Sequence, residues 1–203
     1  QYFNPLTSLY LFPRGEDFSD VAVYERYDDL SGVNTQYWPY GDLGGVSSQN
    51  PYWIMNRMNR ENDRRRYKLA ASLQYNIIEG LNVQGRVSID NTESKYTEKF
   101  HAGTVGNFAG PKGRYKEENR LDRQVYADVL ANFNKTFNEF NVTANLGASI
   151  KDLRMELTSL HGDLNNVTNH FTIENLTRSG YYKVDADGLK RQTQSVFANA
   201  EIG

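Results

Sequence analysis

Two aromatic groups in the N-terminal third of the chain are the residues best suited to binding chemistry. Both tryptophans lie there, one in TQYWPYGD (residues 35–42) and one in NPYW (residues 50–53). Aromatic faces beside polar groups suit sugar rings or peptide backbones, because stacking combines with directional hydrogen bonds. Tyr37, Trp38 and Tyr40 are therefore the candidates for ligand contact. The alternative is that these rings pack the loop on itself, and that role is favoured for the two aromatic residues of NPYW.

Patterns for catalysis and metal binding are poor. The histidines His101, His161 and His170 are scattered over predicted loops, with no carboxylate at metal-ligand spacing. The sequence holds no GxSxG, Walker-type or HExxH motif, and GDLGG at residues 41–45 lacks the strand–loop–helix context of a phosphate-binding loop. We therefore expect a protein that is not an enzyme and that uses no cofactor or metal.

The bulk composition narrows the class of protein. The 203 residues carry a formal net charge of −2, which gives no reason to expect a nucleic-acid partner. Aromatic residues make up 13 % of the chain, which argues against disorder, and the absence of cysteine excludes disulfides. No run of 18 apolar residues is present, so a transmembrane helix is excluded. A transmembrane barrel is not excluded, because its strands alternate and carry a weaker hydropathy signal.

Alternation of apolar and polar residues is the dominant pattern, and it predicts an all-β chain. It recurs in four full segments and one truncated segment, at residues 67–77, 81–90, 121–133, 140–151 and 190–202. In the first two segments the apolar face carries Tyr67, Leu69, Leu73, Val83 and Val87, and the opposite face carries Lys68, Gln74, Arg86 and Asp90. The third segment is interrupted by Arg123 and Leu130.

The lengths of the segments and of their connections bear on what covers the apolar face. Residues 67–77 and 140–150 each run about 11 residues, which fits the ~9–11 of a tilted membrane strand better than the ~5–6 of a soluble strand. Short turns alternate with long links over residues 91–120 and 152–189. Outer-membrane barrels sort their connections in this way, and a Greek-key sandwich has no reason to do so.

Two environments for the apolar face are therefore compared. If the face contacts lipid, the chain is an antiparallel transmembrane β-barrel segment whose polar face meets a hydrated lumen. If it contacts a protein core, the chain is a soluble β-sandwich module that binds carbohydrate. Strand length and loop asymmetry favour lipid. An outer-membrane phospholipase would need a nucleophile with a positioned base, and none can be assembled from this sequence.

Two stretches carry a resemblance to a known family. NPLTSLYLFPRGEDF (residues 4–18) is followed in order by QNPYWIMNRMNRENDRRRYKLAASLQY (residues 49–75), where NPYW precedes polar sequence and then a barrel-type strand. Together with the strand pattern, they resemble the SusC/RagA-like TonB-dependent transporters in the cell outer membrane of Bacteroidetes. The resemblance covers essentially the whole chain, as an internal portion of the barrel.

The resemblance implies a function and a set of partners. Members of the family look like large barrels of the 22-stranded class, with a plugged lumen. They import nutrients, typically oligosaccharides or peptides, with energy relayed by TonB through a plug domain, and a SusD-like surface lipoprotein covers the opening. Under this resemblance Tyr37, Trp38 and Tyr40 would contact ligand or lid. Lys68, Gln74, Arg86 and Asp90 would line the lumen or hold the plug.

The resemblance also sets the expected domain organisation. Residues 1–63 are expected to form a long extracellular loop region, and residues 64–203 about five barrel strands with short periplasmic turns and long extracellular loops. The sequence contains no plug, begins without methionine and stops within an alternating pattern. Because five strands cannot close such a barrel in lipid, we expect an internal piece whose function is that of a longer parent protein.

Overall fold

The chain forms one long antiparallel sheet and a set of short elements, in a computed structural model that describes residues 4–10, 12–40, 49–176 and 182–203. The side chains of the last range are described from residue 188 onward, and GDLGG at residues 41–45 falls outside the described residues. The elements are, in order, α1 (Pro5–Tyr10), η1 (Phe18–Ala22), β1 (Glu25–Asp28), β2 (Val33–Gln36), α2 (Pro51–Arg57), β3 (Met58–Ile78), β4 (Leu81–Phe100), β5 (Arg114–Phe137), β6 (Phe140–Asp163), η2 (Ile173–Asn175) and β7 (Tyr182–Ile202).

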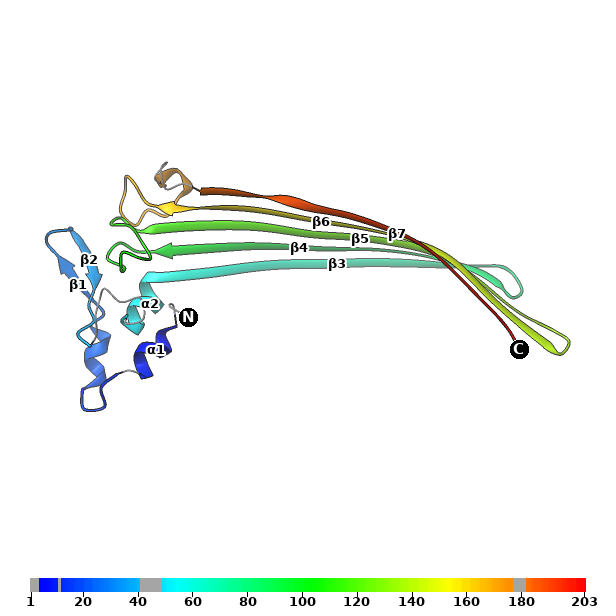
Figure 1. Ribbon diagram of the computed structural model, residues 1–203, viewed down its shortest axis with the longest axis horizontal. Helices are drawn as coiled ribbons and strands as arrows, with labels where there is room; N and C mark the ends of the chain where they lie inside the picture. The colour runs from blue at the N-terminus through cyan, green and yellow to red at the C-terminus, as the bar shows by residue number, and fades with distance from the viewer. Residues whose placement is uncertain (1–3, 11, 41–48, 177–181) are drawn as a thin grey trace. The chain divides into compact units, whose positions relative to one another are not determined.

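The sheet has the simplest possible strand order. β3, β4, β5, β6 and β7 lie side by side in chain order and run antiparallel, as Figure 1 shows, while β1 and β2 form a separate antiparallel pair. The sheet is open, with β3 and β7 at its two edges. The all-β prediction, with five strands, is confirmed.

Every strand is longer than the alternating pattern predicted. β3 to β7 run 21, 20, 24, 24 and 21 residues. The links expected over residues 91–120 and 152–189 were therefore wrong in length, because β4 continues to Phe100, β5 begins at Arg114 and β6 continues to Asp163.

The physical reason lies in the composition of the added strand segments. Polar residues dominate both faces of NRENDRR at residues 59–65, of TESKYTEK at residues 92–99 and of KEENR at residues 116–120. Alternation marks a strand only where its two faces meet different environments. A strand with two polar faces has the sequence pattern of a loop. For the same reason the expected boundary at residue 64 lies after the observed start of β3 at Met58.

Two tight turns connect β3 to β4 and β5 to β6. Gly80 has a φ of +83° and Asn138 a φ of +52°, the left-handed conformation that short hairpin turns require. A side chain at Gly80 would also collide with the carbonyl oxygen of Asn134. The short turns predicted at these two places are confirmed.

The chain divides into two compact units, which are described separately. The first holds residues 1–63, 95–119 and 158–185, and the second holds residues 64–94, 120–157 and 186–203. The first unit therefore contains the region expected as a long loop, which in the structure carries α1, η1, the β1–β2 pair, α2 and the start of β3.

The first unit has two small hydrophobic clusters. The larger is formed by Trp53, Ile54, Met58, Phe100 and Ala109. The smaller is formed by Tyr115, Leu164 and Leu176, with Phe171 packed against it. Both clusters join strand ends to the segments beside them, so this unit is folded around its own side chains.

The second unit exposes the apolar face of the sheet. Tyr67 is 53 % exposed, Leu69 64 % and Leu73 77 %. The same holds for many of the large apolar side chains that alternate along the other strands, including Val87, Val129, Phe140, Leu146, Val196 and Ile202. Among the described residues no helix is both long enough and apolar enough to span a membrane.

Candidate functional site

Five aromatic side chains of the first unit gather into a group that we call the aromatic cluster: Phe12, Phe18, Trp38, Tyr40 and Tyr52. The ring centroids of Phe12 and Tyr40 lie 4.8 Å apart, those of Phe12 and Phe18 5.4 Å, and those of Trp38 and Tyr40 5.5 Å, all edge to face. The ring of Tyr52 lies 6.5 Å from that of Phe18. Edge-to-face pairs of this kind hold aromatic rings in fixed positions.

The three aromatic residues singled out from the sequence have different surroundings. Trp38 is only 3 % exposed, so its ring serves packing in this arrangement. Tyr40 is half-buried within the aromatic cluster. Tyr37 stands apart from the cluster, and the guanidinium carbon of Arg26 lies 3.4 Å from its ring centroid, which covers one ring face. Their contact with a ligand or lid remains a prediction.

Asn50, the first residue of NPYW, ties the segments around the cluster together. It is fully buried and N-caps α2, because its Oδ1 accepts a hydrogen bond of 2.9 Å from the backbone N–H of Tyr52. Its Nδ2 donates to the carbonyl oxygens of Val21 and Tyr37, at 2.9 and 3.0 Å. Its backbone N–H donates to Oε1 of Gln36 at 2.8 Å. One side chain thus joins α2, η1 and the segment that carries Tyr37.

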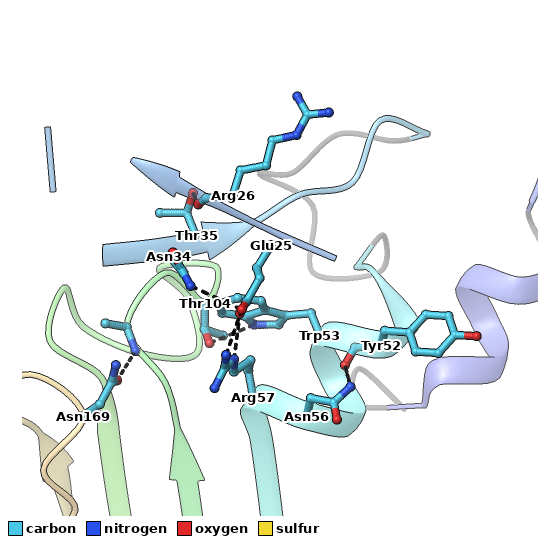
Figure 2. Close-up of polar contacts among 11 residues, drawn as sticks. Glu25, Arg26, Asn34, Thr35, Tyr52, Trp53, Asn56, Arg57, Thr104 and Asn169 are labelled. Carbon is cyan, nitrogen blue, oxygen red and sulfur yellow. Dashed lines mark hydrogen bonds and ion pairs between the residues drawn. The ribbon is translucent and has the colours of Figure 1, made fainter. Parts of the chain in front are cut away.

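Trp53, from the same motif, is the centre of the larger hydrophobic cluster. It is 0 % exposed, and Figure 2 shows its indole directed toward Thr104, whose Oγ1 accepts a 3.1 Å hydrogen bond from Nε1. The loop that holds Thr104 is tied in turn to Asn169, whose Oδ1 accepts a 2.7 Å hydrogen bond from the N–H of Ala102. Trp53 is a loop anchor, as the sequence favoured.

Arg57, the last residue of α2, forms a two-point ion pair with Glu25 of β1 (Figure 2). Its Nε and Nη2 each donate a 2.8 Å hydrogen bond to the carboxylate, which also accepts one from Nδ2 of Asn34 at 3.2 Å. The hydrogen bonds from Arg57 lower the pKa of Glu25, against an opposing effect of burial. The β1–β2 pair is thereby fastened to α2.

The polar face of the second unit carries a ladder of charged and polar pairs between strands. Arg86 of β4 forms an ion pair of 2.9 Å with Asp128 of β5, and the Asp128 side chain is 1 % exposed. Arg66 of β3 forms one of 2.6 Å with Asp90 of β4. Nδ2 of Asn132 donates a 2.9 Å hydrogen bond to Oδ1 of Asn82. These pairs bind neighbouring strands on one face of the sheet.

The four residues predicted to face the lumen are therefore not equivalent. Arg86 and Asp90 are held in ion pairs, and Arg86 is exposed together with Lys68 and Gln74. The partners Asp128 and Arg66 were not among the candidate residues. Asp128 could have been found, because alternation along residues 121–133 puts it on the polar face.

Among the described residues no group of three or more His, Asp or Glu side chains could hold a metal ion. His101 packs its ring 5.0 Å from that of Phe171, and burial lowers its pKa, with the charge of Arg57 adding to the effect. His161 lies among charged side chains of β4 and β5. The features that stand out are therefore the aromatic cluster and the polar ladder.

Comparison with solved structures identifies the class of fold. The chain is similar to part of the RagAB peptide importer in its open-open state, with a TM-score of 0.64 and 14 % sequence identity over 82 % of this chain and 18 % of that chain. The closed-closed state of the same importer gives a TM-score of 0.64 and 15 % identity over the same shares of each chain. The likeness shows that the chain shares the fold of part of that importer, including its long antiparallel β-sheet.

The likeness has limits in extent and in sequence. The chain spans about 18 % of the length of the importer chains that it matches. No protein-family model matches the chain, and no curated protein sequence matches it.

Proposed function

We propose that this chain is part of the barrel wall of an outer-membrane nutrient importer that works with a surface lipoprotein of the SusD kind. The importer would be TonB-dependent, with TonB acting through a plug domain, and its cargo would be an oligosaccharide or a peptide. The likeness to the RagAB peptide importer supports this class of function.

The observation that carries the proposal is the exposure of a continuous apolar face in the second unit. Leu69, Leu73 and Val196 are 64 %, 77 % and 80 % exposed, and they share that face with many other large apolar side chains. Each large apolar side chain left in water forgoes about 1.5–3 kcal/mol of burial free energy. A face of this kind needs an apolar environment, and a bilayer supplies one along the full width of a sheet.

The point at which alternation ends agrees with a bilayer of limited thickness. Along β3 the apolar face ends at Tyr67, and the preceding residues, RENDRRR at residues 60–66, are polar on both faces. A strand of 21 residues is about twice as long as the ~9–11 that cross a bilayer. We infer that residues 67–77 cross the bilayer and that residues 58–66 extend into the extracellular space.

The aromatic cluster is the proposed contact site for ligand or lid. Phe18 is 40 % exposed, and Tyr40 and Tyr52 are half-buried, so part of the cluster surface is open. Trp38 would act from beneath, by holding Tyr40 in place. Tyr37 would offer the ring face that Arg26 leaves free. Lys68 and Gln74, which are exposed on the polar face, would line the lumen.

Spin labels at neighbouring positions of β3 test the orientation of the sheet. Leu73→Cys and Gln74→Cys, each labelled with a nitroxide in the full-length protein in bilayers, are compared for collisions with oxygen and with a water-soluble nickel complex. Oxygen concentrates in lipid, so the label at residue 73 should favour oxygen and the label at residue 74 the nickel complex. Labels at Glu61 and Asn62 are the control, and both should favour the nickel complex.

The result also separates this proposal from a soluble β-sandwich that binds carbohydrate. A sandwich would bury Leu73 against a second sheet, so its label would be inaccessible to both reagents. Either that result or equal preferences at residues 73 and 74 would overturn the barrel proposal. Co-purification of a surface lipoprotein with the tagged full-length protein, lost on Phe18→Ala together with Tyr40→Ala, would support the lid contact.

A further inference from the structure

A group of charged side chains lies where β4, β5 and β6 run together in the first unit, and one of its cations has no counter-charge among the described residues. Arg114 and Lys116 of β5 lie beside His161 of β6, and Glu98 of β4 completes the group. We call these four residues the Arg114 group. None of them belongs to the aromatic cluster or to the polar ladder.

Two members of the Arg114 group have partners of their own, and the third is uncharged. Nζ of Lys116 lies 3.0 Å from the carboxylate of Glu118, so its charge is compensated. The carboxylate of Glu98 accepts a 3.0 Å hydrogen bond from the hydroxyl of Tyr96. Burial lowers the pKa of His161, and the positive charges of Arg114 and Lys116 add to the effect, which keeps the imidazole neutral near pH 7.

Arg114 is the exception. Its Nε is buried and donates no hydrogen bond, and no carboxylate among the described residues lies within ion-pair distance of its guanidinium. A buried donor without an acceptor is destabilising, and more so where it is charged. The side chain as a whole is half-buried, so an acceptor from outside can reach its exposed part, and contact with the buried Nε would require the side chain to shift.

The chemistry of the surroundings selects one kind of acceptor. A guanidinium presents Nε–H and Nη–H as a fork that matches the two oxygens of a carboxylate. A neutral imidazole beside it supplies one further donor. Glu98 and Glu118 lie close enough to repel a doubly charged phosphate more strongly than a singly charged carboxylate.

We propose that Arg114, with His161 beside it, binds a carboxylate group of a cargo molecule. The site would take the C-terminal carboxylate of a short peptide or the carboxylate of an acidic sugar, and the shared chemistry is a single planar anion. That the carboxylate belongs to a cargo molecule rests on the proposed importer function. Binding of a carboxylate by Arg114 does not depend on that function.

Binding to the full-length protein in detergent tests the site, with calorimetry as the readout. The probes are trialanine, trialanine amide, glucuronate and glucose. The carboxylate-bearing member of at least one pair should bind about 10- to 100-fold more tightly than its neutral counterpart, as expected for a charge-assisted contact. Preference within the peptide pair alone identifies a peptide terminus. Preference within the sugar pair alone identifies an acidic sugar, and preference within both pairs identifies the carboxylate as such.

Variants then assign the preference to this residue. Arg114→Gln should abolish it, and Arg114→Lys should retain only part of it, because lysine keeps the charge and loses the fork. Arg154→Gln is the matched control, since Arg154 is an exposed arginine of β6 that already has Asp152 at 3.3 Å. Equal affinities within both pairs, no binding by any probe, or a preference that survives Arg114→Gln would each overturn the proposal.

The wild-type comparison alone decides the outcome if the Arg114 variants do not fold. Failure here is also distinct from failure of the importer proposal. That proposal depends on the lipid exposure of Leu73, which is measured without any ligand, and carboxylate binding is measured in detergent without any transport.

Discussion

The guanidinium of Arg57 at the end of α2 donates two hydrogen bonds, each 2.8 Å long, to the carboxylate of Glu25 in β1. Their side chains are 31 % and 23 % exposed, so the pair is partly shielded from water. Two parallel bonds fix the relative orientation of the two groups more firmly than a single contact does. The pair therefore links the β1–β2 hairpin to the helix that NPYW begins.

Removal of this pair should loosen the hairpin without unfolding the sheet. Glu25→Gln keeps the shape of the side chain and removes the charge, and we expect a local loss of about 1 kcal/mol, which corresponds to about fivefold less protection from exchange. Hydrogen exchange of the amides of β1 and β2 measures it. Asp152→Asn removes the exposed Asp152–Arg154 pair and is the control, expected to change protection little. Equal effects of the two variants would contradict the prediction.

Asn50 gives a sharper test, because Asn and Asp are interchangeable at an ordinary helix N-cap. Here Nδ2 also donates to two buried carbonyl oxygens, of Val21 and Tyr37. Asn50→Asp keeps the cap, loses both of these bonds and brings a negative charge against the two carbonyls. We expect a loss of at least about 2 kcal/mol, read from exchange protection of the amides of α2 and η1. If Asn50→Asp lowered exchange protection no more than a surface substitution does, the N-cap alone would account for the role of Asn50.

Trp53 and Thr104 should behave as a coupled pair. Thr104→Val leaves the indole Nε1–H buried without its acceptor, at a cost of about 1–3 kcal/mol. Trp53→Phe removes the donor and some volume, and in that background Thr104→Val should cost much less. A double-mutant cycle on the stability of the first unit measures the coupling, and additive effects would contradict the hydrogen bond.

The sequence predicted the strands well where the two faces of the sheet differ. Residues 67–77 and 140–150 alternate strictly, and both lie within strands of the structure. It failed along residues 91–100, which are strand in the structure but polar on both sides. Period-two patterns report a contrast between faces, so they cannot reveal a strand whose two faces are equally polar.

The candidate site was predictable only in part, for a related reason. NPYW pointed to Trp53 as an anchor, but the helix α2 that this motif begins was not predicted, because residues 1–63 were expected to form a loop. The burial of Trp38 and the position of Arg26 over Tyr37 depend on segments distant in the chain, and no local pattern carries that information. Arg114 lies in a segment that was expected to be a loop. Its lack of an ion-pair partner among the described residues could be recognised only from the structure, where β4 and β6 lie beside β5.

Gly147 explains why two apolar side chains, Leu130 and Phe197, lie on the polar face of the sheet. A Cβ at this position would collide with the ring of Phe197 on β7 and lie 3.1 Å from Cδ1 of Leu130 on β5. The two apolar side chains therefore meet over the glycine, and the ring fills the space that a side chain would take. Aromatic residues on a neighbouring strand often cover a glycine in this way.

Gly147→Ala should displace the Phe197 ring and destabilise the sheet by about 1–2 kcal/mol. Gly85→Ala is the matched control, because no atom lies within 4 Å of its Cβ position, and alanine there should be neutral or slightly stabilising. The heat-unfolding midpoint of the full-length protein in detergent compares the two variants. In a Phe197→Ala background the cost of Gly147→Ala should largely disappear, and an unchanged cost would contradict the packing argument.

His101 makes the first unit sensitive to acid. Burial lowers its pKa from 6.5, and the charge of Arg57 adds to this effect while Glu25 partly opposes it. The unfolded segment therefore takes up a proton before the folded one as the pH falls through 6.5, so local stability is complete above that value and declines below it. Exchange protection of the amides of residues 101–113, corrected for the intrinsic effect of pH, should fall as the pH is lowered from about 6.5 to about 5.5. Titration of Glu25 does not enter this window, because the hydrogen bonds from Arg57 lower its pKa below 4.5. His101→Gln should remove the decline, and an equal decline in that variant would assign the acid sensitivity to another group.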